Sequence, residues 1–363
     1  MMKTLFAALA LVALLPVGAR AENGGWKQSW EETLAAAKQE GKVVISGPPS
    51  QDLRTALPAA FKARYGINIE YLGGRSTESA TRMRAERQAG IYSIDIVFAG
   101  IQSMALTFYR DKMIQPLKPA LQLPEVVDGT KWKKGKLWFS DPDDLYILRL
   151  ANTVTTMFHI NTNFVKQGEI RTTKDLINPK YKGKIALQDP TIPGSGSNQA
   201  AHLYFQHGED FVKALYVDQK PMISRDTRQI TDGLARGTYP ISLGAEDADV
   251  AKLRKEGIPI ALLDNLSDLY SEISASFGQV AIIDNAPHPN AAKVFVNWIA
   301  SKEGNQIFND AMGTIPTRND TDESKLPPEL IPREGVKYFD TYDWEFTVTK
   351  KEEVRARMKE LLR

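Results

Sequence analysis

The chain has 363 residues, 42% of them hydrophobic and 25% charged, which is typical of a globular protein long enough for two domains. Its 46 lysines and arginines nearly balance its 44 aspartates and glutamates, and this balance argues against nucleic acid as a partner. The sequence contains no cysteine, which excludes disulfides, thiolate metal sites and cysteine nucleophiles.

The first 21 residues have the pattern of a cleaved signal peptide. Lys3 provides the positive start, an apolar run extends from Leu5 to Val17, and Ala19 and Ala21 flank Arg20. The apolar run of about 13 residues is shorter than the roughly 20 that span a membrane. We expect cleavage after Ala21, no lipid anchor, and a mature periplasmic protein with equal numbers of acidic and basic residues.

Strand and helix signals alternate along the chain from residue 30 onward. Hydrophobic periodicity and glycine stops predict helices over 30–39, 51–65, 76–89, 198–206, 227–236, 246–255, 290–301, 303–312 and 350–363. Short apolar runs predict strands over 42–46, 67–72, 95–98, 155–160, 184–187, 239–243 and 279–283. Ser76 and Asn290 are the expected caps of their helices. Three strand–helix units in the first hundred residues predict a parallel, doubly wound α/β sheet.

Small and polar residues follow several of the predicted strands. In an open α/β sheet, ligands bind beyond the carboxyl ends of the strands. Glycine lets the backbone approach a ligand, and a helix N-terminus offers N–H groups and the positive end of a dipole. We therefore predict a binding site for an anion, although each loop could equally be a simple turn or cap. The candidate ligand-binding residues are Ser46, Gly47, Gly73, Gly74, Arg75, Ser76, Gly100, Ser195, Gly196, Ser197, Thr227, Arg228, Gly244 and Glu246.

Charged and aromatic side chains near these loops can extend the site. Arginine grips a carboxylate or a phosphonate with two parallel hydrogen bonds, and Arg75, Arg225 and Arg228 lie beside the loops. Each of these arginines could instead be a solvated surface charge. Three aromatic residues could form a wall of the site or belong to the core, namely Phe98, Trp138 and Tyr146.

Three motifs resemble one known family. Residues 280–304, VAIIDNAPHPNAAKVFVNWIASKEG, resemble the signature of type 2 periplasmic solute-binding proteins of ABC importers, in the branch that includes the ferric-iron binders. Residues 183–197, GKIALQDPTIPGSGS, resemble the branch's anion-holding loop, and Pro316-Thr317-Arg318 resembles its final motif. Within the first motif the resemblance implies a turn role for His288, and a metal ligand is the alternative.

The resemblance covers about residues 30 to 320 and implies two doubly wound α/β lobes joined by crossover strands, with the ligand in a cleft between them. We expect lobe 1 at 22–152 plus 266–318, lobe 2 at 153–265, and a C-terminal segment 319–363 packed on the lobes. The crossings are expected near 153–158 and 269–276.

The resemblance also raises ferric iron as a ligand. Iron binders of this branch bring tyrosines after a strand of the second lobe, where this chain reads Leu-Gly-Ala-Glu-Asp at 243–247. They often add a histidine after the first strand and an acidic residue after the third. This chain has Gly-Pro-Pro-Ser at 47–50 and Ala-Gly at 99–100. All three positions lack the expected ligand.

No catalytic constellation stands out. The sequence has no G-x-S-x-G, HExxH or Walker motif, and its four histidines are scattered. We therefore predict the binding component of an ABC importer, which captures an anionic organic solute, a carboxylate or phosphonate, and delivers it to a membrane permease. We expect a monomer with no cofactor and no metal. Ferric-iron transport, a secreted hydrolase on a related fold, and a periplasmic sensor remain alternatives.

Overall fold

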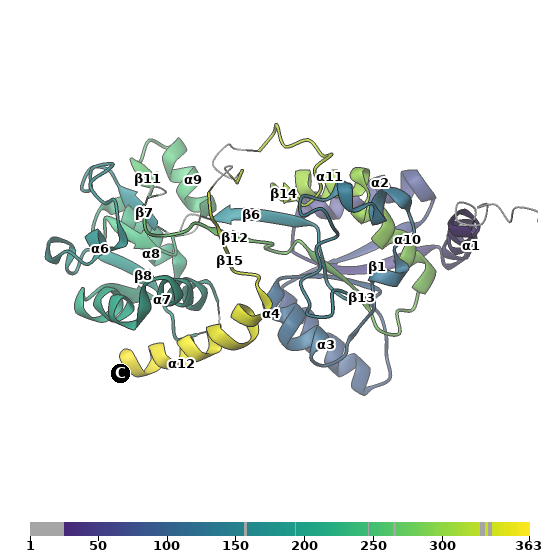
Figure 1. Ribbon diagram of the computed structural model, residues 1–363, viewed down its shortest axis with the longest axis horizontal. Coiled ribbons are helices and arrows are strands. Elements are labelled where there is room, and N and C mark those ends of the chain that lie inside the picture. The colour runs from purple at the N-terminus through teal and green to yellow at the C-terminus, as the bar shows by residue number, and fades with distance from the viewer. Residues whose placement is uncertain are drawn as a thin grey trace, which may run out of the picture.

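The computed structural model describes residues 25–155, 158–192, 194–245, 247–263, 266–326, 331–332 and 336–363. The predicted signal peptide and Glu246 lie outside the described residues. Figure 1 shows two α/β lobes side by side, joined by strands that run between them. The predicted fold class is confirmed. Within the described residues, no helix is both long enough and apolar enough to cross a membrane.

Lobe 1 is built on a six-stranded sheet with the order β2-β1-β3-β13-β4 and with β5 beside β13. Its strands are β1 (Lys42–Gly47), β2 (Asn68–Gly73), β3 (Ile96–Ala99), β4 (Ile114–Gln115), β5 (Leu148–Arg149) and β13 (Gln279–Ile283). Strand β1 is parallel to β2 and β3, as predicted. Strand β13 is antiparallel to β3, because the chain re-enters lobe 1 from the opposite direction after crossing from lobe 2.

Helices cover both faces of this sheet. They are α1 (Gly25–Glu40), α2 (Gln51–Tyr65), α3 (Ser76–Gln88), α4 (Ile101–Ser103, continued by a π-helical segment Met104–Tyr109), α5 (Pro124–Val127), α10 (Pro289–Ala300) and α11 (Lys302–Met312). Helix α2 buries Leu53, Leu57 and Phe61, which helical periodicity places on one face. The Phe61 ring lies 5.5 Å from that of Phe295 and 5.2 Å from that of Trp298, so α2 and α10 share one core.

Lobe 2 contains a five-stranded sheet with the order β11-β7-β10-β8-β9. Its strands are β7 (Phe158–Asn161), β8 (Ile185–Gln188), β9 (Met222–Ser224), β10 (Ile241–Leu243) and β11 (Ile260–Leu262). Its helices are α6 (Thr173–Leu176), α7 (Ser195–Lys213, continued by a π-helical segment Ala214–Asp218), α8 (Thr227–Arg236) and α9 (Asp247–Lys255). Strands β8, β9 and β10 are mutually parallel neighbours, whereas β7 is antiparallel to β10.

Two antiparallel strands connect the lobes, β6 (Ala151–Thr155) and β12 (Glu272–Ser274). The short strands β14 (Ile315–Pro316) and β15 (Phe339–Asp340) extend this connecting sheet on either side. The strand predicted over 155–160 corresponds to the end of β6 and to most of β7, and residues 156–157 lie outside the described residues.

The C-terminal segment spans the junction between the lobes. After β15 it forms a π-helical segment, Phe346–Lys350, and then α12 (Lys351–Leu361), drawn in yellow in Figure 1 beside α7 of lobe 2. On the lobe 1 side, the Trp344 ring lies 5.0 Å from that of Tyr109. On the lobe 2 side, the Arg357 guanidinium pairs with Glu209 of α7 at 2.6 Å.

Two predicted caps and two predicted helix starts are wrong. Helix α1 already includes Gly25, five residues before its predicted start at 30. Arg75 is the N-cap of α3, and Ser76 is its first helical residue, so no side chain caps this helix. Helix α10 begins at Pro289, and its cap comes from another element. Glu40, at the end of α1, accepts from the backbone N–H groups of Asn290 at 3.2 Å and Ala291 at 2.7 Å. Helix α7 begins at residue 195, three residues before the predicted start.

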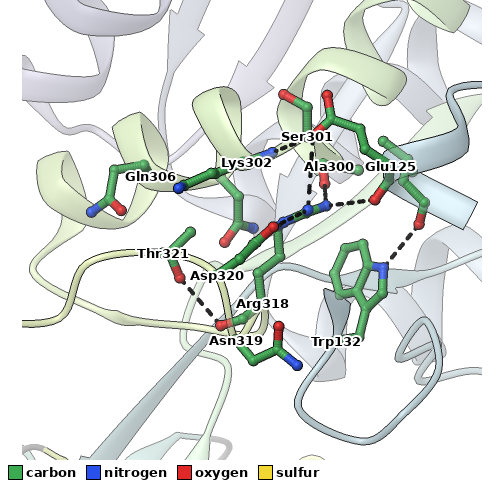
Figure 2. A network of polar contacts seen from close by, with 12 residues as sticks. Glu125, Trp132, Ala300, Ser301, Lys302, Gln306, Arg318, Asn319, Asp320 and Thr321 are labelled. Carbon is green, nitrogen blue, oxygen red and sulfur yellow. Dashed lines mark hydrogen bonds and ion pairs between the residues drawn. The ribbon is translucent and has the colours of Figure 1, made fainter. Parts of the chain in front are cut away.

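The motif at residues 316–318 stabilises lobe 1 (Figure 2). The Arg318 guanidinium is fully buried and forms two hydrogen bonds of 2.8 Å with the Asp320 carboxylate. It also donates to the backbone oxygens of Ala300 at 2.9 Å and Glu125 at 3.1 Å. The guanidinium stacks 5.5 Å from the ring centre of Trp132. This arginine therefore ties the end of α10 to α5.

Candidate functional site

The predicted residues of lobe 1 meet at one edge of its sheet. In the parallel register Gly47 lies opposite Gly73, and the Gly74 N–H donates to the Gly47 oxygen at 2.9 Å. Ser46 lies opposite Val97, two residues before β3 ends, so three strands end here. The structure thus brings the segments 46–47, 73–76 and 99–100 to the same edge.

Several of these residues are required by packing inside lobe 1. A Cβ atom on Gly47 would lie 2.5 Å from the Tyr71 hydroxyl oxygen, so any larger residue would collide. The Ser46 side chain is 1% exposed, and its hydroxyl donates to Ser79 at 2.9 Å. Arg75, in contrast, is exposed at the start of α3.

Gly100 lies against the C-terminal segment, which the sequence did not indicate. A Cβ on Gly100 would be 3.2 Å from the Tyr342 hydroxyl oxygen and 3.4 Å from the backbone oxygen of Ser276. The Tyr342 hydroxyl donates to that same oxygen at 2.6 Å. Ser276 follows β12, one of the two strands that connect the lobes. This edge of the lobe 1 sheet therefore lies next to the connecting strands.

The predicted residues of lobe 2 also share one edge. Gln188 ends β8 beside Ser224 of β9, and Leu187 lies opposite Leu243 of β10. Ser195 donates to the Gln188 side-chain oxygen at 2.5 Å. A Cβ on Gly244 would lie 2.7 Å from the Cβ of Gln188. Gln188 is therefore the centre of this edge, and sequence reasoning missed it although it opens the recognised loop.

The first turn of α7 is held rigidly at this edge. A Cβ on Gly196 would lie 2.4 Å from the backbone oxygen of Asp189, so only glycine fits. The Ser197 side chain is 2% exposed, and its hydroxyl donates to the Gly194 oxygen at 2.9 Å. The Ser197 hydroxyl thus shapes the loop, and the first N–H groups of α7 have no carbonyl partner within their own helix, which is the usual basis of an anion site at a helix start.

Arg225 and α8 complete the lobe 2 edge. Burial opposes ionisation of Asp189, but hydrogen bonds from Thr191 and Arg225 outweigh it and lower the pKa of this carboxyl. Asp189 thus balances the charge of Arg225. The Asp226 carboxylate caps α8 by accepting from the Arg228 backbone at 2.9 Å, and Thr227 is the first helical residue.

The lobe 2 edge also borders the crossing. Phe158, the first described residue after β6, lies opposite Leu243 in the antiparallel register, and its oxygen accepts from the Leu263 backbone at 2.9 Å. The carboxyl ends of β8 and β10 lie at the same edge. The two groups of predicted residues therefore sit on separate lobes, each beside the strands that join them.

A cationic cluster at the lobe 1 end of the crossing was missed by the sequence analysis. The Arg149 side chain is 1% exposed and pairs with the Asp340 carboxylate at 2.9 Å. Its guanidinium lies 4.0 Å from the ring centre of Trp138, and the Lys134 ammonium lies 3.4 Å from the same centre. Burial lowers the pKa of Lys134, and the nearby Asp340 opposes this shift. The sequence offered one sign of this cluster, since Arg149 is a charged residue within the largely apolar run 146–154.

The other predicted aromatic residues do not join these edges. Phe98 is 1% exposed and stacks on Phe308 in the core at 5.1 Å. Tyr146 and Tyr109 line a cavity of about 620 Å³ on lobe 1, and none of the ligand-binding residues predicted at the strand ends lies in its lining. The strand ends are the candidate site, because strand registers and hydrogen bonds place them together.

His288 has a structural partner. Its backbone N–H and its ring Nδ1 contact the Asp95 carboxylate at 2.7 Å and 2.8 Å, and this carboxylate also accepts from the Val44 backbone. His288 is the N-cap residue of α10. In the part of the chain that the structure describes, no three His, Asp or Glu side chains form a group that could hold a metal ion.

Comparisons with known proteins agree with this architecture. A curated relative, an uncharacterized protein of Haemophilus influenzae, is 24% identical over 308 residues, which cover 82% of this chain and 84% of the relative. The periplasmic binding protein AfuA of Actinobacillus pleuropneumoniae, solved with fructose-6-phosphate, superposes with a TM-score of 0.60 at 19% identity, over 88% of this chain and 97% of AfuA. The Trichodesmium protein IdiA (FutA), solved with iron and citrate, gives 0.67 at 16% identity, over 88% and 99%.

These solved structures share the two-lobe fold, and the decisive match is to a family model. The model of the bacterial extracellular solute-binding proteins matches residues 56–330, most of both lobes. The match sets aside the hydrolase alternative, because proteins of this kind bind a substrate for transport and are not enzymes. The chain therefore belongs to the bacterial extracellular solute-binding protein family.

Proposed function

We propose that this protein captures a small organic anion, a carboxylate or a phosphoryl or phosphonate compound, between its two lobes and delivers it to an ABC permease. We also propose that the two lobes have the predicted boundaries, that the protein is a monomer, and that it is exported to the periplasm and cleaved after Ala21. Closure of the lobes about β6 and β12 would let one solute contact both edges, and such contacts favour the closed state.

The observation that supports this proposal best is the first turn of α7. Its residues 195–197 lie where β8 and β10 end. The backbone of Gly196 packs so closely on the backbone of Asp189 that no side chain fits between them. The helical run from Ser195 to the break in helical geometry at Gly208, whose φ is +80°, presents a positive dipole end and N–H groups that have no partner within their own helix. The cations Arg149 and Lys134 on the other lobe add to the preference for an anion.

The related proteins support the same class of solute. AfuA is solved with fructose-6-phosphate and IdiA with citrate, and both compounds are organic anions. IdiA also holds iron, so ferric iron remains the competing ligand. The positions where the resemblance implies iron ligands carry no tyrosine or histidine in this chain. Glu246 and Asp247 at the matching stretch 243–247 could offer carboxylates to iron, but at the start of a helix acidic residues complement the dipole, so this set favours the organic anion.

A thermal-shift screen of the purified protein tests the proposal. The panel comprises citrate and other carboxylates, fructose 6-phosphate, phosphonates, polyols, amino acids and Fe³⁺. A carboxylate or phosphoryl compound at 100 times its dissociation constant should add about 2.7 kcal/mol of stability. A shift with Fe³⁺ or with polyols, and none with the organic anions, would reject the proposed solute class.

Replacing Gly196 by alanine should weaken binding of the best ligand in that screen about tenfold, or about 1.4 kcal/mol. The added Cβ would push the first turn of α7 away from Asp189 and misplace its N–H groups. Isothermal titration calorimetry measures the change in affinity.

The matched control is Gly129→Ala, because a Cβ there would lie 2.5 Å from the backbone oxygen of Gly135, in a turn of lobe 1. Both variants should lose stability through overpacking. Equal affinities of the two variants would mean that the α7 turn does not contact the solute.

A further inference from the structure

Arg149 holds a buried guanidinium at the lobe 1 end of the crossover strands. It ends β5, and β6 begins two residues later. Its Nη1 donates to both oxygens of the Asp340 carboxylate, at 3.0 Å and 2.9 Å. Its Nη2 is buried without a hydrogen-bond partner among the described residues. Because a buried charged donor without a partner is unfavourable, this guanidinium has capacity for a further acceptor.

A second cation lies beside it. The Lys134 ammonium and the Arg149 guanidinium both contact the ring of Trp138, with centre distances of 3.4 Å and 4.0 Å. The negative charge of the Asp340 carboxylate favours the protonated form of both cations and so opposes the lowering of their pKa values by burial. Two positive charges thus face one negative charge, and the planar fork of an arginine matches a carboxylate or a phosphoryl group.

The carboxylate that occupies this place comes from the C-terminal segment. Asp340 lies in β15, which pairs in parallel with crossover strand β12, and it is 191 residues away from Arg149 in sequence. Its side chain is 29% exposed, whereas that of Arg149 is 1% exposed. One oxygen of Asp340 also accepts from the Tyr342 backbone at 3.0 Å, and the Tyr342 hydroxyl oxygen lies next to Gly100 of the predicted site.

We propose that Arg149 and Lys134 form an anion subsite of the solute site, and that the Asp340 carboxylate occupies it until the carboxylate or phosphoryl group of a solute takes its place. The inference rests on the proposed function, because it requires an anionic solute between the lobes. Exchange of one anionic group for another keeps the buried guanidinium paired, so no uncompensated charge is left. The C-terminal segment then acts as an internal competitor that lowers the apparent affinity for solute.

Calorimetric titration of Asp340→Asn with inorganic phosphate, citrate and fructose 6-phosphate tests this competition. The substitution keeps the shape of the side chain and removes its charge. At least one of the three anions should bind D340N at least ten times more tightly than the wild type. The matched control is Glu345→Gln on the same segment, whose side chain is 74% exposed and which should bind as the wild type does. Adding Arg149→Gln to D340N should abolish the gain.

Loss of Asp340 also leaves Arg149 without its counter-ion, so D340N should melt at a lower temperature than the wild type. Phosphate, compared with chloride at equal ionic strength, should raise the melting temperature of D340N more than that of the wild type. The melting measurement requires only that the variant is folded at the lowest temperature of the scan. It therefore tests the inference even if D340N is unstable.

The outcomes separate this inference from the proposed function. Anion binding by D340N alone would show that the two cations can hold an anion, but it would overturn both the exchange with Asp340 and the proposed function, because the wild type would then bind no anionic solute. Anion binding by the wild type, with equal or weaker binding by D340N and no recovery in phosphate, would reduce Asp340 to a structural counter-ion and overturn the inference. No response of either protein to any of the three anions would reject both.

Discussion

Replacing Arg318 by methionine should lower the free energy of unfolding by about 3–5 kcal/mol, because it breaks a buried ion pair and removes two further hydrogen bonds. The Arg318 side chain is fully buried and holds Asp320 with two bonds of 2.8 Å (Figure 2). The backbone oxygens of Ala300 and Glu125 would also lose their donor. Urea denaturation followed by circular dichroism measures the loss.

The control is the same substitution at an exposed ion pair. Arg84 is 42% exposed and pairs with Asp111 at 2.5 Å, so Arg84→Met should cost no more than about 1 kcal/mol. The solute affinity of folded R318M should equal that of the wild type, since Arg318 contacts α5 and α10 and not the strand ends. A loss similar to that of R84M would contradict the structural role of this motif.

The second large effect concerns Lys351, whose stabilising contribution should change with pH. Its side chain is 2% exposed where α12 begins, and burial lowers its pKa from 10.5 to about 8, although Glu272 opposes the shift. The unfolded chain therefore retains a proton that the folded protein releases between pH 8 and pH 10.5. Folding stability should rise with pH across this window, by about 3 kcal/mol from this residue.

The variant Lys351→Met isolates this contribution, because methionine fills a similar space without a charge. The difference in unfolding free energy between wild type and K351M should grow in favour of the wild type from pH 8 to pH 10.5, and stay constant below pH 8. Lys350→Met, at a side chain that is 39% exposed, should follow the wild type, because it retains the buried Lys351. A difference that does not vary with pH would show that Lys351 is not buried as described.

Local signals predicted several elements with their observed bounds. The helix 51–65 begins where the Ser50 hydroxyl accepts from the Leu53 backbone and ends at Gly66, whose φ is +74°. The helix 227–236 likewise begins at its Asp226 cap and ends at Gly237. Capping side chains and left-handed glycines act within four residues, so the sequence displays them directly.

Predictions failed where a distant residue intervened. Asn290 does not cap its helix because Glu40, 250 residues earlier, supplies the carboxylate. The ligand-binding role of Gly100 stays a prediction, and the sequence did not reveal that its neighbours Tyr342 and Ser276 come from the C-terminal segment and from the end of crossover strand β12. The Asp340 that holds Arg149 was equally invisible, since it lies in a stretch that reads as an irregular tail.

The amino-acid sequence alone determined the α/β class, the family motifs and the glycine-rich strand ends, because hydrophobic periodicity and turn chemistry act over a few neighbouring residues. The tertiary structure decided which of these ends share an edge, which hydroxyls are occupied inside a lobe, and which carboxylate neutralises Arg149. Those outcomes depend on register and on contacts across up to 250 residues, and packing of the whole chain sets them.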